Sequence, residues 1–161
     1  MAWTLFSAAE AGLAVADVGL VGLSPSGKLS VVGGGESHDG AAALKLMAAD
    51  GAASYAERSI EGPALVSFWW RVSSEEVYDV FSYSVDGVVQ ESISGEGVWL
   101  KRSLSLAAGR HALRWTYRKD DADKNFQDAG FLDEVVIVEA YRNLEVSLGG
   151  AAVAGSATLD Y

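Results

Sequence analysis

The chain has 161 residues, a formal net charge of −10 and no cysteine. This length suits one domain, and the acidity argues against nucleic acid or anionic membranes as partners, because phosphate binding depends on Lys and Arg. The absence of cysteine excludes disulfides, thiolate metal sites and cysteine nucleophiles. We find no apolar stretch long enough for membrane insertion and no signal-peptide pattern, and the two ends suggest a segment of a longer polypeptide.

The N-terminal third has the least regular pattern. Residues 29–40 indicate a strand followed by a glycine loop, in which residues 36–39 would bring additional oxygens near a ligand. Residues 41–50 have helix-forming composition, but their β context favours a strand.

The clearest strand covers residues 65–72, where apolar residues alternate with polar ones. The inner face of this strand would consist of Val66, Phe68, Trp70 and Val72. Because neighbouring residues of a strand point to opposite faces, Trp69 and Arg71 would lie outside the core.

Further strands follow at short intervals. Phe81 and Tyr83 share an inner face, and Asp86-Gly87 is a typical hairpin turn. Residues 98–106 and 111–118 are predicted to form two strands joined by a turn at residues 107–110. The second of these strands would place His111 with the apolar Leu113, Trp115 and Tyr117.

After a charged loop over residues 119–130, the segment 131–141 forms the last strong strand, apolar on both faces over residues 135–138 and therefore central in its sheet. Short strands separated by turns predict an all-β fold, a two-sheet antiparallel β-sandwich of the jelly-roll type. We assign residues 1–141 to this domain. Residues 142–161 would be a C-terminal β tail or the start of a following module.

Three linked segments, residues 61–87, 93–120 and 128–137, resemble a module repeated in large secreted and surface proteins of bacteria. The module is similar to MAM-type and concanavalin-like jelly-roll domains, whose last strand carries an aromatic, an aliphatic, an acidic pair and an aliphatic residue, as residues 131–135 do here. The resemblance covers about residues 36–138. It implies the sandwich fold, a secreted or cell-surface location, a non-catalytic role and neighbouring domains, but one sandwich can host several functions.

The charged loop is a candidate calcium site. Asp121, Asp123 and Asn125 have the spacing with which calcium loops present side-chain oxygens, and Asp128 follows closely. The loop is not an EF-hand, because Phe126 occupies the position of the required glycine and no Glu closes the motif. The alternative is a solvated acidic loop.

The outer face of the 65–72 strand is a candidate ligand platform. Aromatic rings stack on the C–H faces of sugars, while neighbouring polar groups bind hydroxyls. We therefore predict that Trp69, Arg71, Tyr78 and Trp99 bind a polysaccharide or glycan. In the alternative, Trp69 packs under the acidic loop or the N-terminal segment.

Catalysis has little support in the sequence. His38 and His111 are the only imidazoles, and His111 would be a hydrogen-bonded residue at the edge of the core. Asp79 falls on an inner face, where its carboxylate would need a cation or several donors. We expect a non-catalytic carbohydrate-binding module that calcium stabilises. The alternative is a structural or adhesive spacer without a small ligand.

Overall fold

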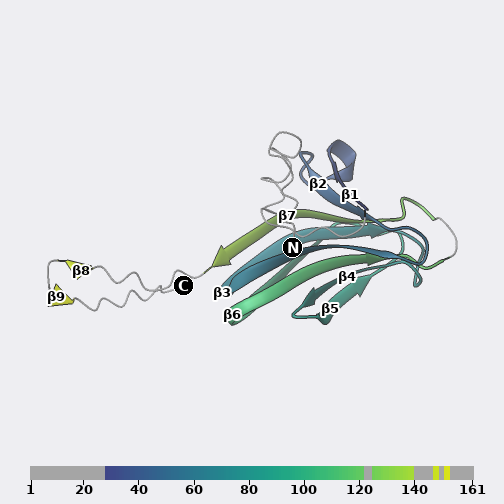
Figure 1. Ribbon diagram of the computed structural model, residues 1–161. Coiled ribbons are helices and arrows are strands. Elements are labelled where there is room, and N and C mark those ends of the chain that lie inside the picture. Colours follow the sequence, from purple (N-terminus) through teal and green to yellow (C-terminus); the bar gives the residue numbers. More distant parts are fainter. Residues whose placement is uncertain (1–27, 122–124, 140–146, 149–150, 153–161) are drawn as a thin grey trace.

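The computed structural model describes residues 28–121, 125–139, 147–148 and 151–152 (Figure 1). After β1, residues Gly34–Glu36 form a short 3-10 helix, η1. The strands are β1 (Lys28–Val32), β2 (Ala43–Met47), β3 (Ala53–Ser73), β4 (Val80–Val85), β5 (Val88–Ile93), β6 (Leu100–Arg118), β7 (Ala129–Glu139), β8 (Ser147–Leu148) and β9 (Ala151–Ala152).

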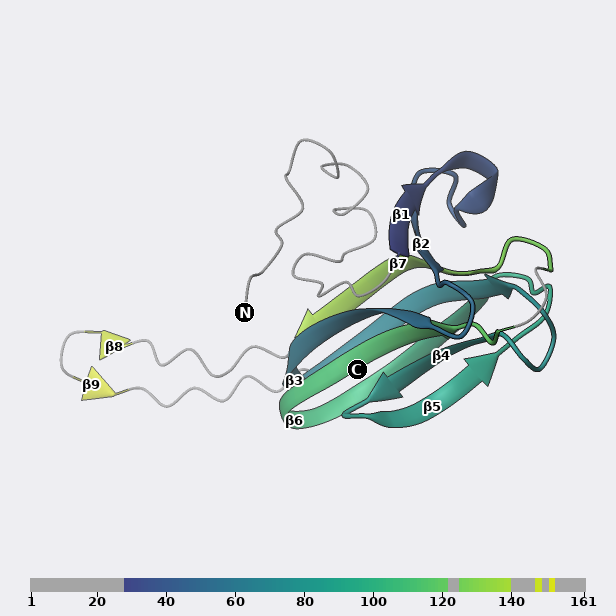
Figure 2. The same ribbon diagram turned by 45° about the vertical axis from the view of Figure 1, so that its right-hand side comes forward.

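Within these residues, β1 to β7 form one antiparallel ladder in the order β1-β2-β7-β3-β6-β4-β5. The first half of β3, residues 53–62, pairs with residues 109–118 of β6. The second half pairs with residues 100–106 of β6 and also with β7. Both long strands double back at the same end of the molecule (Figures 1 and 2), so that one continuous sheet supplies two facing layers.

The bend is built at Gly62, where the pairing register shifts. A Cβ atom at Gly62 would lie 1.8 Å from the carbonyl oxygen of Ala107, so the two backbones approach too closely for any other residue. The sequence analysis predicted a turn between two strands at residues 107–110. That prediction was wrong: β6 continues through this segment, because both of its halves pair with β3 and not with each other.

The core lies between the two layers and is rich in aromatic rings. Phe68 and Trp70 of one layer meet Trp115 and Phe81 of the other, with ring centres 5.3 Å apart for Phe68–Trp115 and 5.5 Å for Trp70–Phe81. Gly130 leaves the space for this packing, since a Cβ there would fall 2.6 Å from the Phe81 ring.

The predicted inner faces are confirmed: Val66, Phe68, Trp70 and Val72 are buried, as are Phe81, Tyr83, Leu113, Trp115 and Tyr117. The hairpin at Asp86-Gly87 joins β4 to β5, and both residues have positive φ. β7 lies inside the sheet between β2 and β3, and residues 43–47 form a strand as predicted. The protein is therefore an all-β, antiparallel sandwich.

β8 and β9 pair with each other, but the predicted boundary at residue 141 lies outside the described residues and stays a prediction. No helix among the described residues is long and apolar enough to cross a membrane.

Candidate functional site

The two neighbouring tryptophans are directed to opposite faces of β3. Trp70 is fully buried against Phe81 and Tyr83. Trp69 is partly exposed on the outer face of the layer formed by β7, the second half of β3 and the first half of β6. There it lies between Asp133 of β7 and Lys101 of β6.

One face of the Trp69 indole is covered by His38. The two rings are stacked, with centres 3.8 Å apart and planes inclined by 18°. Two acids of β7 hold His38 there: its backbone N–H donates to Asp133 Oδ2 at 2.6 Å, and its Nδ1 pairs with Glu134. The glycine loop between β1 and β2 therefore reaches Trp69 and occupies one face of that ring, while the ammonium of Lys101 lies over the ring at 5.8 Å from its centre.

Asp133 is the buried anchor of this arrangement. Its carboxylate accepts the backbone N–H of His38 and, at 2.7 Å, that of Glu134. Burial raises the pKa of Asp133 above its ordinary 3.8, because the charged form loses hydration, and the two N–H donors oppose that shift only in part.

A second aromatic group lies beside Trp69 on the same face. The guanidinium carbon of Arg71 lies 4.1 Å from the ring centre of Phe131 and 5.4 Å from that of Trp99. Trp99 also makes an edge contact with His38, at 5.8 Å between ring centres. Three of the predicted ligand residues are thus linked on one face: Trp69 to Trp99 through His38, and Trp99 to Arg71 directly.

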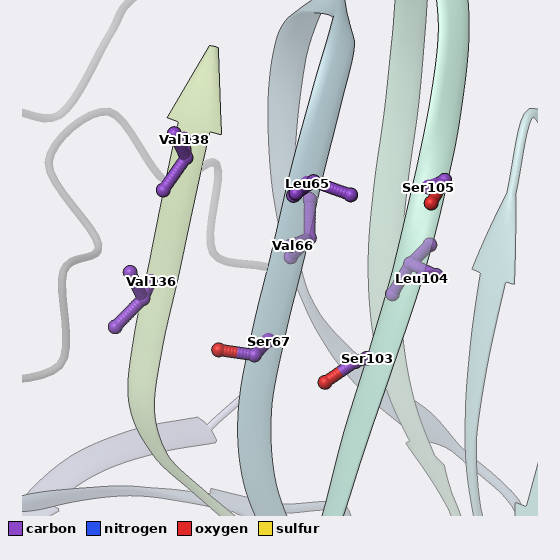
Figure 3. Close-up of a pocket in the computed structure, with 8 residues that line it drawn as sticks. All are labelled: Leu65, Val66, Ser67, Ser103, Leu104, Ser105, Val136 and Val138. Atoms are coloured by element: carbon purple, nitrogen blue, oxygen red, sulfur yellow. The ribbon is translucent and has the colours of Figure 1, made fainter. Parts of the chain in front are cut away.

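Next to Trp69 the outer face is open and forms a groove of about 350 Å³ (Figure 3). Leu65 of β3 and Val136 and Val138 of β7 expose 52–58% of their surface there. Ser67 points toward β7 and Ser103 of β6 points toward β3 (Figure 3). The groove therefore combines aliphatic surface with hydroxyl groups. Its lining residues are Leu65, Val66, Ser67, Ser103, Leu104, Ser105, Val136 and Val138.

Tyr78 stands apart from this face. It lies in the turn between β3 and β4, is 58% exposed, and makes no ring contact with Trp69 or Trp99. Its predicted role in ligand binding stays a prediction.

The predicted calcium ligands are described only in part. Asp121 and Asn125 are exposed, Asp123 lies outside the described residues, and the Asp128 carboxylate lies 3.4 Å from the ammonium of Lys119. Among described residues no group of three or more acidic or histidine side chains is placed to hold a metal ion. Calcium binding stays a prediction.

Lys119 supplies the cation that Asp79 requires. Both side chains are buried, with 3.2 Å between Lys119 Nζ and Asp79 Oδ2. The other oxygen of Asp79 accepts the backbone N–H of Asp120 at 2.9 Å. Burial lowers the pKa of Lys119, but the carboxylates of Asp79 and Asp128 outweigh it, so the pKa is raised. The inner-facing acid is thus part of a structural ion pair.

His111 lies at the edge of the core, as predicted. Its Nδ1 is 2.7 Å from Asp86 Oδ2 and its Nε2 is 3.1 Å from the carbonyl oxygen of Ala107. The hydrogen bond to Asp86 raises the pKa of His111 above 6.5. These contacts tie the β4–β5 hairpin to β6.

Three residues of the face were not among the predicted ligand residues. His38 was predicted only to lie in a loop near the ligand. Its stacking on Trp69 could not be predicted, because the two residues are 31 positions apart in the sequence. The position of Lys101 on this face can be predicted only when the register of β6 against β3 is known, because that register pairs Lys101 with Trp69. Phe131 is recognisable only by its register with Arg71.

A scan against family models found no match, and neither did a search of curated proteins. Solved structures do match. The secreted serine protease VesC from Vibrio cholerae has a TM-score of 0.64 at 15% identity, over 84% of this chain but 28% of the protease chain. TmCBM61, in complex with β-1,4-galactotriose, has a TM-score of 0.53 at 16% identity, over 75% of this chain and 90% of that module.

The CBM22-1 and GH10 modules of the Clostridium thermocellum xylanase 10B, complexed with xylohexaose, match with a TM-score of 0.50 at 15% identity, over 78% of this chain and 28% of that one. At such identities the likeness concerns the fold. It agrees with the strand pairing and the core in showing a jelly-roll β-sandwich. The narrower resemblance to MAM domains stays a prediction.

Proposed function

We propose that this chain is a non-catalytic module that binds a carbohydrate on the outer face of β7, β3 and β6. One observation carries the proposal: Trp70 occupies the core, so Trp69 is held on the outside of β3, two residues from Ser67 of a groove lined by serines and aliphatic side chains. A rigid indole and hydroxyl groups on one face suit the two sides of a sugar, which are its C–H surfaces and its hydroxyls.

The solved structures support this proposal at the level of fold. TmCBM61 is solved with a galactotriose and the xylanase modules with a xylohexaose, but those ligands belong to those proteins. Because one sandwich hosts many functions, the assignment for this chain depends on the Trp69 face itself.

The proposal includes no catalytic step. His38 and His111, the two imidazoles of the chain, are both engaged by carboxylates: His38 by Glu134 and His111 by Asp86. We further propose that the module works in a secreted or surface-attached bacterial protein as one of several domains of MAM-like type, a setting that the sequence resemblance suggests.

The test is a glycan array followed by affinity electrophoresis, with Trp69→Ala as the variant. We expect affinity to fall by about thirtyfold, the loss typical of an aromatic residue at the centre of a binding site. Tyr55→Ala is the matched control. Tyr55 lies on the outer face of the other layer, also with a cation near its ring: the guanidinium carbon of Arg114 is 4.1 Å from its centre.

Undiminished sugar binding by Trp69→Ala, with a melting temperature close to that of the unchanged protein, would rule out the Trp69 face. Binding of no glycan at all would favour the second candidate, a structural or adhesive spacer. The coverage of one indole face by His38 is the observation that favours that alternative, since it gives Trp69 a packing role of its own.

A further inference from the structure

Among the residues that the structure describes, two cations beside Trp69 have no carboxylate partner. Lys101 is paired with Trp69 across the β3–β6 ladder, and its ammonium lies 5.8 Å from the indole centre. Arg71 follows two residues after Trp69 and so projects from the same face. Over the described ranges neither cation forms an ion pair, whereas Arg102 and Arg114 are each paired with a glutamate.

Arg71 is held in place by two aromatic rings. Phe131 and Trp99 lie 4.1 and 5.4 Å from the guanidinium carbon. Its Nε is buried and has no hydrogen-bond partner in the structure. Aromatic faces stabilise the positive charge, but the N–H groups of a guanidinium match best the two oxygens of a planar anion. Arg71 is therefore oriented in advance for a carboxylate.

The two acids of β7 beside Trp69 are engaged by other groups and form no ion pair with Arg71 or Lys101. Asp133 accepts two backbone N–H groups, and Glu134 is paired with the His38 ring. The net charge of −10 opposes an anionic ligand only weakly at this point, because exposed charges farther than about 8 Å are largely screened at physiological ionic strength.

We propose that the ligand is an acidic glycan, with the carboxylate of a uronic acid placed against Arg71 and Lys101. The chain of sugars continues along the groove, because Ser67 precedes Trp69 and Ser103 follows Lys101 on the same faces of β3 and β6. This inference rests on the proposed function and specifies that the carbohydrate ligand is negatively charged.

The test compares matched polymers in affinity electrophoresis: polygalacturonate, alginate and glucuronoxylan, each with its carboxyl-reduced counterpart, which keeps the sugar chain and lacks the charge. We expect the acidic form of at least one pair to bind more tightly than its reduced form, and added salt to weaken the difference. Lys101→Gln should lower affinity for that acidic polymer by about tenfold and leave affinity for the reduced one unchanged.

Arg71→Gln should act in the same way. Arg71 also packs against Phe131 and Trp99, so the melting temperature of the Arg71→Gln variant is measured as well. If this variant is unstable, the test depends on Lys101→Gln, because Lys101 is exposed. Arg118→Gln is the matched control: it removes an exposed cation at the other end of β6 and should change neither affinity.

Equal binding of acidic and reduced polymers, or an equal effect of Arg118→Gln and Lys101→Gln, would overturn the inference. Binding of the reduced polymers that still depends on Trp69 would then leave the proposed function intact. If none of the polymers and no glycan on the array is bound, both the inference and the proposed function are wrong.

Discussion

The side chains around Trp69 show how neighbouring residues of one type acquire different roles. The alternation of a strand requires that only one ring of the doublet enters the core, so the outward direction of Trp69 follows from the sequence alone. The identity of its neighbours does not, because His38 arrives from a loop and Asp133 from another strand. A ring stacked by histidine on one side receives a ligand only from the other.

Asp133 gives this face a pH dependence. Its pKa is raised above 3.8 by burial, so the folded state holds the proton more tightly than the unfolded state does. Below pH 3.8 the carboxyl group is protonated in both states and has no destabilising effect. As pH rises from 3.8 through the folded-state pKa, the carboxylate ionises and the free energy of unfolding falls. We expect Asp133→Asn, which cannot ionise, to gain stability relative to the unchanged protein over that rise, as measured by urea unfolding at a series of pH values.

A stability difference for Asp133→Asn that stays constant, or that moves against the variant as pH rises, would contradict the assignment.

The strands were predictable where large apolar residues alternate with polar ones, as in the second half of β3, in β4 and in the second half of β6. The first half of β3 was not recognised, because its inner face consists of Ser54, Ala56 and Ile60, two of which are too small to produce a visible pattern. The bend in β6 cannot be told from a hairpin turn by sequence, because a strand that changes layer at a glycine has the same local signal as a true turn.

Lys119 connects loops at one end of the sandwich to β6. Its ammonium lies 3.2 Å from Asp79, 3.4 Å from Asp128 and 4.0 Å from Asp50. We expect Lys119→Met to lower the free energy of unfolding by about 3 to 5 kcal/mol, because it leaves the Asp79 carboxylate buried without a cation. Guanidinium denaturation measures this.

The double variant Lys119→Met/Asp79→Leu removes both charges and should recover much of that loss. If the double variant is no more stable than Lys119→Met alone, the pair is not the reason for the loss. Arg110→Met provides a surface comparison: its contact with Glu61 is 3.6 Å long and exposed, and removing it should cost less than about 1 kcal/mol.

At the scale of the whole molecule, the acidity of the chain does not show which charges share one face. Net charge and pI are sums over the sequence, so neither could reveal that Lys101 and Arg71 project from the same outer face of neighbouring strands. The fold class could be predicted from the chain, whereas the character of the ligand face required the register of three strands.

The calcium hypothesis also concerns the molecule as a whole, because a bound ion stabilises only the folded state. It predicts that a chelator lowers the melting temperature and that Asp121→Ala combined with Asp123→Ala abolishes the effect. Differential scanning calorimetry with and without chelator provides the measurement. A melting curve that chelator leaves unchanged would show the loop to be a solvated acidic segment.

The doubling back of β3 and β6 ties the two layers of the sandwich together. A slip of one residue between these strands would turn buried rings toward water in both walls at once, since each wall contains part of the same ladder. In a sandwich assembled from separate sheets, such an error would stay confined to one wall. Here a misaligned chain loses nearly its entire apolar interior, so a near-native but shifted arrangement has little to stabilise it.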